Sequence, residues 1–228
     1  MMSPIPAPTP RRRILRAAAA EFAAFGFDAA RLGSIAERAG VDLPTLNRLI
    51  RGKSNLYATV LLDLLAQALA RVGPAVAAAP SPERRLRATV SGIAAVASEN
   101  PHFSPLLLRE IASGGASLPN SVVAHMQLLF RILSQTLSHG AAGGAFRPVD
   151  PVVVQMTVAG SLLVFIAAAP IVARLGESKA GAPLDRHLAD SISDLLLDGL
   201  RPHLEQSRRA SGADRPSAHP RGKKEGTR

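Results

Sequence analysis

The sequence of 228 residues contains no cysteine and no tryptophan, and it has a single tyrosine, Tyr57. Without cysteine the chain cannot form disulfides, thiolate metal sites or cysteine nucleophiles, which excludes zinc fingers and small disulfide-stabilised secreted modules. Aromatic residues make up only 4% of the chain, whereas hydrophobic residues make up 47%, so a substantial core is still possible. A chain of this length forms one or two domains, at roughly 100–200 residues per domain.

Positive charge is concentrated at the two ends of the chain. The 27 Lys and Arg residues exceed the 17 Asp and Glu residues and give a net charge of +10. Residues 1–55 hold nine basic and four acidic residues, residues 201–228 hold eight and three, and residues 56–200 hold ten of each. Basic ends on a neutral body predict a polyanionic partner, either nucleic acid or an anionic membrane surface.

Neither end of the chain has the pattern of a folded or targeting segment. Residues 1–10 contain four prolines and no charge, and predict a disordered lead-in. An apolar run of signal-peptide length does not follow the basic residues 11–13, so we expect a cytoplasmic protein. Residues 204–228 predict a disordered basic tail, which either solubilises the chain or is attracted to DNA phosphates.

The apolar residues recur at helical spacing along the whole body, and no segment alternates at period two. We therefore predict an all-α fold of about nine helices. The first helix is expected to end at Gly26, and the fourth is expected to begin near Gly52 and to end near Gly73. The expected apolar stripe of the first helix comprises Ile14, Ala18, Phe22 and Phe25.

Residues 32–50 have the pattern of a helix-turn-helix, in which two short helices are joined by Gly40-Val41-Asp42. Asp42 is a good N-cap for the second helix, and a proline is tolerated in the first turn of a helix. The residues expected to face inward from the second helix are Leu46, Leu49 and Ile50. In a DNA-binding helix-turn-helix this second helix enters the major groove.

The outward side chains of the second helix have DNA-binding chemistry. Asn47 can pair with both edge groups of adenine, and Arg48 can bind O6 and N7 of guanine. Thr45 suits a phosphate or a thymine methyl group, and Leu43 is expected on the same face. Lys53 is placed at the start of the fourth helix, where its ammonium can meet a phosphate.

The segment from residue 14 to residue 56 resembles the N-terminal domain of TetR-type transcriptional regulators. The spacing that carries this resemblance runs through Phe22, Gly26, Ile35-Ala36, Gly40-Val41, Thr45-Leu46, Lys53 and Leu56. The resemblance implies an all-helical homodimer that binds double-stranded DNA. It also implies a helix-turn-helix domain over residues 11–55 and a larger ligand-binding and dimerisation domain over residues 56–203.

The sequence departs from the pattern of that family at three positions. Asn47 stands where the family usually has an aromatic residue, Ile50 stands where it has Phe or Val, and Arg31 lies where a hydroxyl commonly caps the second helix. Asn47 is then expected either to contribute less to DNA binding than the usual aromatic residue or to read a base instead, and Arg31 is expected to replace a hydroxyl contact with a charged one. The full set of expected DNA-binding residues is Arg31, Leu43, Pro44, Thr45, Asn47, Arg48 and Lys53.

Residues 151–173 form an uncharged stretch of 23 residues, long enough to span a bilayer. Gln155 and Pro170 interrupt this stretch, no Trp or Tyr marks its ends, and a helix that is apolar all round can equally be buried in protein. The resemblance implies that the last two helices form an intersubunit four-helix bundle. The expected interface residues are Val158, Leu162, Phe165, Leu188, Ile192, Leu195 and Leu196.

Nothing in the sequence has the spacing of an enzyme site. The six histidines lack metal-ligand spacing, the carboxylates at positions 190, 194 and 198 fit a solvated helix face, and no phosphate-binding loop or nucleophile motif is present. We therefore expect no metal and no cofactor. By resemblance, a small apolar or amphipathic effector is expected within residues 56–140, lined by Phe103, Leu107, Glu110, Met126 and Phe130.

The function hypothesis from the sequence is a ligand-responsive DNA-binding regulator, a repressor that binds a near-palindromic operator as a homodimer. The main alternative is a helical binding or scaffold protein with a degenerate helix-turn-helix and only non-specific DNA affinity. A membrane-associated protein with a single span at residues 151–173 is a further alternative.

Overall fold

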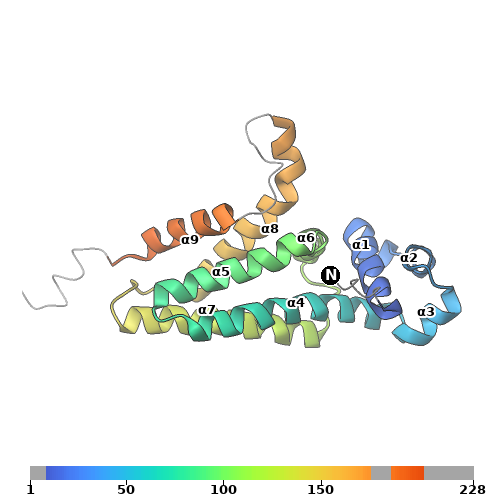
Figure 1. Ribbon diagram of the computed structural model, residues 1–228, viewed down its shortest axis with the longest axis horizontal. Coiled ribbons are helices and arrows are strands. Elements are labelled where there is room, and N and C mark those ends of the chain that lie inside the picture. The colour runs from blue at the N-terminus through green and yellow to red at the C-terminus, as the bar shows by residue number, and fades with distance from the viewer. Residues whose placement is uncertain (1–8, 176–185, 203–228) are drawn as a thin grey trace, which may run out of the picture.

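The computed structural model describes residues 9–175 and 186–202, and most of these residues lie in helices (Figure 1). These residues contain nine α-helices and no strand, as the apolar periodicity predicts. The helices are α1 (Pro10–Ala29), α2 (Leu32–Ala39), α3 (Leu43–Ile50), α4 (Lys53–Ala78), α5 (Pro82–Glu99), α6 (Phe103–Ala112), α7 (Asn120–Ala142), α8 (Pro151–Leu175) and α9 (Arg186–Leu200).

The three helices α1, α2 and α3 lie together at one end of an elongated molecule, and the long helices α4, α5 and α7 run along its length (Figure 1). Thr9 caps α1 by accepting a hydrogen bond from the Arg12 N–H at 3.4 Å, and Pro10 occupies the first turn. Both residues fall within the lead-in predicted over residues 1–10, so α1 begins before the predicted end of that segment. Residues 1–8 and the predicted tail at 204–228 lie outside the described residues.

The last turn of α1 is broken at Gly26, which has φ 76° and ψ 179°, a backbone conformation that favours glycine. Regular helix therefore ends where the sequence predicts, although helical residues resume and continue to Ala29. Phe25 was expected in the core and is instead 54% exposed. The aromatic core positions here belong to Phe22, Phe27 and Tyr57, whose rings contact one another.

Helix α4 connects the two ends of the molecule and is longer than predicted. It continues through Pro74 to Ala78, although proline removes a helical hydrogen bond and usually ends or kinks a helix. Close packing against α5 holds α4 in place at this level, because a Cβ at Gly92 would lie 2.8 Å from Cγ2 of the buried Val72. The predicted end near Gly73 was wrong because this tertiary contact outweighs the local proline signal.

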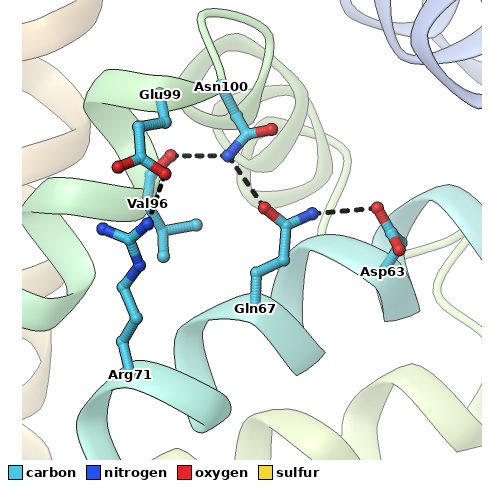
Figure 2. Close-up of polar contacts among 6 residues, drawn as sticks. All are labelled: Asp63, Gln67, Arg71, Val96, Glu99 and Asn100. Carbon is cyan, nitrogen blue, oxygen red and sulfur yellow. Dashed lines mark hydrogen bonds and ion pairs between the residues drawn. The ribbon is translucent and has the colours of Figure 1, made fainter. Parts of the chain in front are cut away.

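Polar side chains also join α4 to α5 (Figure 2). Arg71 and Glu99 form an ion pair at 2.5 Å, and the Asn100 amide donates to Gln67 Oε1 at 3.3 Å. Gln67 in turn donates to Asp63 Oδ2 at 2.9 Å. Because the charged members are exposed, this network orients the two helices more than it stabilises them.

Two clusters of buried apolar side chains make up the core. The first joins the helix-turn-helix to α4 and α6, and the second joins α5, α7, α8 and α9. Since Leu56 and Tyr57 of α4 lie in the first cluster, the proposed domain boundary at 55/56 falls inside a continuous helix and a continuous core. The small helical end is therefore not connected to the body by a flexible linker.

Helix α8 packs on the body along part of its length, and its C-terminal part projects away from the bundle (Figure 1). Val154, Val158 and Leu162 are buried in the second cluster, whereas Val153, Met156 and other apolar residues are exposed. By length and composition, two described segments could cross a membrane: α4 and residues 151–171 of α8, with mean hydropathies of 1.5 and 2.2. Both carry core residues of the helical body.

Candidate nucleic-acid interface

The turn between α2 and α3 is built as the sequence predicts. Gly40 ends α2 in the left-handed conformation, with φ 63° and ψ 44°, and its N–H donates to Glu37 O at 3.1 Å. Asp42 caps α3 by accepting a hydrogen bond from the Thr45 N–H at 2.7 Å. Hydrogen bonds from Thr45 hold the pKa of Asp42 below its usual value, so the carboxylate stays charged at neutral pH.

Helix α3 exposes most of its side chains to solvent. Leu46 and Ile50 anchor it in the first core cluster, and the expected DNA-binding side chains Leu43, Pro44, Asn47 and Arg48 are exposed, with Thr45 half-buried. Residues 43 and 47, like residues 44 and 48, are four apart and therefore lie on the same side of a helix. The structure thus brings four of the seven predicted side chains to one surface.

Leu49 was expected to face inward, but it is 50% exposed. The eight-residue helix α3 contacts the core only through a narrow stripe at residues 46 and 50, and Leu49 lies to one side of that stripe. It borders a crevice of about 70 Å³ between α1, α3 and α4, which Arg11 and Asn55 also line.

Two predicted DNA-binding residues, Arg31 and Lys53, lie at the N-terminal ends of α2 and α4. Arg31 is exposed at the N-cap of α2, and its side chain makes no capping bond. Lys53 begins α4, but its ammonium donates to Asp28 O at 2.8 Å and lies 5.2 Å from the ring centroid of Phe27. An ammonium has three donors, so a phosphate contact stays a prediction. Through its hydrogen bond to Asp28 O, Lys53 also connects α4 to the C-terminal end of α1.

Sequence reasoning missed two cross-helix contacts around α1 and α2. Glu21 is 2% exposed, and its Oε1 accepts a hydrogen bond from the Arg31 N–H at 3.2 Å. At the other end of α2, Arg13 Nε donates to Ala39 O at 3.0 Å. The only sequence signal for Glu21 was a lone acidic residue within an apolar, alanine-rich segment. Arg13 could not be distinguished from its neighbours in the basic run.

Helix α6 connects the body to this end of the molecule. The Arg109 guanidinium donates to Ala23 O at 2.7 Å and to Ala24 O at 2.5 Å, both on α1. The Tyr57 hydroxyl donates to Glu110 Oε1, while the buried Glu110 Oε2 has no hydrogen-bond partner. Burial, together with Glu110, raises the pKa of Tyr57 well above its usual range. Tyr57 is therefore a neutral donor at any physiological pH.

The expected effector-lining residues differ in exposure. Phe103 and Glu110 are buried, Leu107 and Phe130 are half-buried, and Met126 is 39% exposed. Phe103 and Leu107 pack in or against the first core cluster. Their role in effector binding stays a prediction.

The expected interface residues divide into two sets. Val158, Leu162 and Ile192 are buried in the second core cluster, so in this structure their side chains are already occupied within the protomer. Leu188 and Leu196 are half-buried against the same cluster. Phe165 and Leu195 are exposed and available for contact with another chain.

The sequence and the fold are both similar to known regulators. Residues 14–60 match the model of the TetR family of bacterial regulatory proteins, and residues 82–195 match the model of the tetracyclin repressor-like C-terminal domain. The HTH-type transcriptional regulator RutR of Escherichia coli K12 is 28% identical over 202 residues, which cover 84% of this chain and 91% of RutR.

Solved structures of transcriptional regulators have the same fold. PfmR of Thermus thermophilus superposes with a TM-score of 0.68 at 24% identity, covering 86% of this chain and all of PfmR. The ketosteroid transcriptional regulator KstR2 of Mycobacterium tuberculosis superposes with a TM-score of 0.70 at 21% identity, covering 87% of this chain and 98% of KstR2. The capped helix-turn-helix and the matched C-terminal domain give one conclusion: this chain belongs to the TetR family of helix-turn-helix transcriptional regulators.

Proposed function

We propose that this chain is a cytoplasmic, non-enzymatic repressor that binds a near-palindromic operator as a homodimer and releases it when a small effector binds. The observation that carries the DNA-binding part is the exposed face of α3, on a helix fixed by the Asp42 cap and by buried Leu46 and Ile50. We assign residues 11–55 to DNA binding and residues 56–203 to effector binding and dimerisation.

The proposed roles on DNA follow from the chemistry of the exposed groups. Asn47 and Arg48 read base edges in the major groove, while Leu43, Pro44 and Thr45 contact thymine methyl groups and phosphates. Arg31, at the N-terminus of α2, and Lys53, at the N-terminus of α4, contact backbone phosphates, and such contacts fix the register of the protein on the duplex.

Dimerisation sets the distance between two recognition helices. Exposed apolar residues on α8 and α9, including Phe165 and Leu195, support a contact between these helices and those of a second copy. Two α3 helices must then fit half-sites about 34–36 Å apart, which corresponds to successive major grooves on one side of the duplex. A near-palindromic operator follows from the twofold symmetry of such a dimer.

Effector response is proposed to act through α6. This helix carries the expected lining residues Phe103, Leu107 and Glu110, and it also holds α1 through Arg109 and contacts Tyr57 of α4. A small apolar or amphipathic ligand that favours a different position of α6 would change the spacing of the α3 helices. The ligand must bind that form several kcal/mol more tightly to move the population.

Sequence-specific DNA binding is tested by fluorescence anisotropy, with the upstream region of the gene itself and a scrambled duplex over about 50–200 mM salt. We expect a selective advantage for one duplex that persists at the higher salt. Arg48→Ala should cost about 1–3 kcal/mol of binding and relax specificity. Arg84→Ala is the control, because it removes the same charge from an exposed site on α5.

The competing scaffold hypothesis predicts a different result from the same titration. If both duplexes bind equally and lose affinity together with salt, and Arg48→Ala behaves like Arg84→Ala, the upstream region is not an operator for this chain. A selection from randomised duplexes then decides whether any sequence is preferred. If none is preferred, the repressor proposal is wrong.

A further inference from the structure

The N-terminus of α2 has no capping side chain at its N-cap residue. Its N-cap residue is Arg31, which has an extended backbone and no side-chain capping bond. The first N–H groups of a helix have no partner within the helix, and a carboxylate or hydroxyl normally supplies one. In a capping box, a Glu or Gln at the third helical position accepts from the N–H of the N-cap residue. That position in α2 is occupied by Ser34.

The missing acceptor comes from another helix. Glu21 of α1 accepts from the Arg31 N–H at 3.2 Å through Oε1, and its Oε2 lies 3.8 Å from an Arg38 guanidinium nitrogen. The side chain is buried, so this carboxylate has exchanged water for these two partners. Burial of a carboxylate without hydrogen-bond partners costs folding free energy. The bond to the Arg31 N–H is therefore expected to contribute to stability.

Arg13 makes the corresponding contact at the opposite end of α2. Its Nε donates to Ala39 O at 3.0 Å, in the last turn of the helix. The two contacts match the helix dipole, because an anion lies at the N-terminus of α2 and a cation lies at its C-terminus.

The two contacts also match in spacing. Arg13 and Glu21 are eight residues apart on α1, and Ala39 and Arg31 are eight residues apart along α2 in the opposite direction. Eight residues of helix are about 12 Å long. One face of α1 therefore carries two charged groups at the distance needed to hold both ends of an antiparallel α2.

We propose that Arg13 and Glu21 are positioning residues that form a two-point clamp, fixing α2 on α1 and thereby setting the orientation of α3 on DNA. Neither residue touches DNA in this role. The clamp goes beyond the proposed DNA contacts, since the hydrogen bond to Ala39 O assigns Arg13 a different task from its neighbours Arg11 and Arg12 in the same basic run.

The clamp is tested first through stability. Glu21→Leu fills the buried site but removes the acceptor, whereas Glu21→Gln keeps an acceptor oxygen. We expect Glu21→Leu to lower Tm by a few degrees and Glu21→Gln to lower it less. Ser34→Gln places an acceptor at the capping-box position, and it should restore Tm more in the Glu21→Leu background than it raises Tm in the wild type.

To test the positioning role, the measured quantity must not change when a variant only loses stability. The ratio of affinities for a duplex selected by the wild type and for a scrambled duplex is independent of the folded fraction, because unfolding lowers both affinities equally. Glu21→Leu and Arg13→Met should each lower this ratio about tenfold. That factor is the change in an equilibrium constant that corresponds to the free energy of one lost helix cap. Arg12→Met removes a neighbouring charge without the contact to Ala39, and should lower both affinities while leaving the ratio unchanged.

The outcomes separate this proposal from the proposed function. If Glu21→Leu is as stable as the wild type, or if Ser34→Gln adds the same Tm in both backgrounds, the cap at Arg31 is wrong. If both clamp variants keep the wild-type affinity ratio, the positioning role is wrong. If the wild type selects no duplex at all, the repressor proposal fails. The clamp is then tested only by the Tm values of the Glu21→Leu and Ser34→Gln variants, alone and combined.

Discussion

Two glutamates are buried in the part of the chain that the structure describes, and they differ in how their oxygens are satisfied. Both oxygens of Glu21 have a partner, at Arg31 and Arg38. Glu110 has one partner, the Tyr57 hydroxyl, and its other oxygen is buried without a hydrogen bond. Because a buried polar atom that loses its partner is costly, the Tyr57 hydroxyl matters more here than an average hydrogen bond. It also joins α4 to α6, the helix that contacts α1.

Tyr57→Phe is therefore expected to destabilise the protein by about 1–3 kcal/mol, because it leaves both oxygens of Glu110 without a partner. The ring itself is kept, so its contact with Phe22, at 4.8 Å between centroids, should survive. Urea unfolding measures the change. The double variant Tyr57→Phe/Glu110→Leu removes both polar partners and should recover most of the loss. An unchanged unfolding midpoint for Tyr57→Phe would contradict this account.

His102 gives the molecule a predictable pH dependence. Burial lowers its pKa from the usual 6.5, and the positive charges of Arg38 and Arg16 lower it further. The unfolded state therefore binds a proton more readily, so the contribution of His102 to stability is complete above about pH 6.5 and is lost as the pH falls through the lowered folded-state pKa.

His102→Gln should remove this part of the pH dependence. Between about pH 7 and pH 5 the free energy of unfolding of the wild type should fall more steeply than that of the variant. His125→Gln, on α7, controls for the loss of an imidazole elsewhere. Parallel curves for the wild type and His102→Gln would show that the environment of His102 is not what the structure indicates.

At the scale of helices, the sequence predicted the turn and the cap that depend on neighbouring residues, and it missed the features that depend on contacts between helices. The left-handed end of α2 at Gly40 and the cap of α3 at Asp42 were both predictable, because turn chemistry is local. The extension of α4 through Pro74, the exposure of Leu49 and the cross-helix bonds of Glu21 and Arg109 were not predictable. The extension of α4 and the bonds of Glu21 and Arg109 depend on residues distant in sequence, which periodicity cannot supply, and Leu49 lies to one side of the narrow stripe by which α3 contacts the core.

Helix α7 contains a glycine that only the tertiary structure explains. A Cβ at Gly140 would overlap Cδ2, Cε2 and Cγ of Phe146, whose ring is buried in the second core cluster. Gly140→Ala should therefore cost about 1–3 kcal/mol through overpacking, although alanine favours helix. Gly199→Ala in α9, where nothing lies within 4 Å, should be neutral or slightly stabilising. Thermal unfolding of the two variants compares them, and equal Tm values would argue that Phe146 can move at no cost.

At the scale of the whole molecule, the arrangement of the core bears on how the two ends communicate. The first cluster contains side chains from α1, α2 and α3 as well as from α4 and α6, so the helix-turn-helix end and α6 share one core. The second cluster buries side chains of α8 and α9, while Phe165 and other apolar residues of α8, and Leu195 of α9, are exposed. We expect these residues to contact a second chain, because contiguous apolar residues on the surface of a soluble protein commonly mark an interaction site.

The oligomeric state tests this surface directly. Phe165 is 47% exposed on α8 and Leu195 is 76% exposed on α9, so a charge at either residue should not disturb the protomer but should oppose a contact with a second copy. We expect the wild type to run at twice its 23.8 kDa chain mass in light scattering, and Phe165→Glu to shift towards the monomer with an unchanged circular dichroism spectrum.

Val123→Glu is the matched control for that experiment, since it places the same charge at an exposed apolar residue on α7. It should leave the dimer intact. Because a monomer reaches only one half-site, Phe165→Glu should also lose the added affinity that a second half-site gives, while Val123→Glu keeps it. If Phe165→Glu remains as dimeric as the wild type, the dimer does not form through this part of α8. If Val123→Glu alone dissociates it, the contact lies on α7, and the spacing of the two α3 helices must be derived from that surface instead.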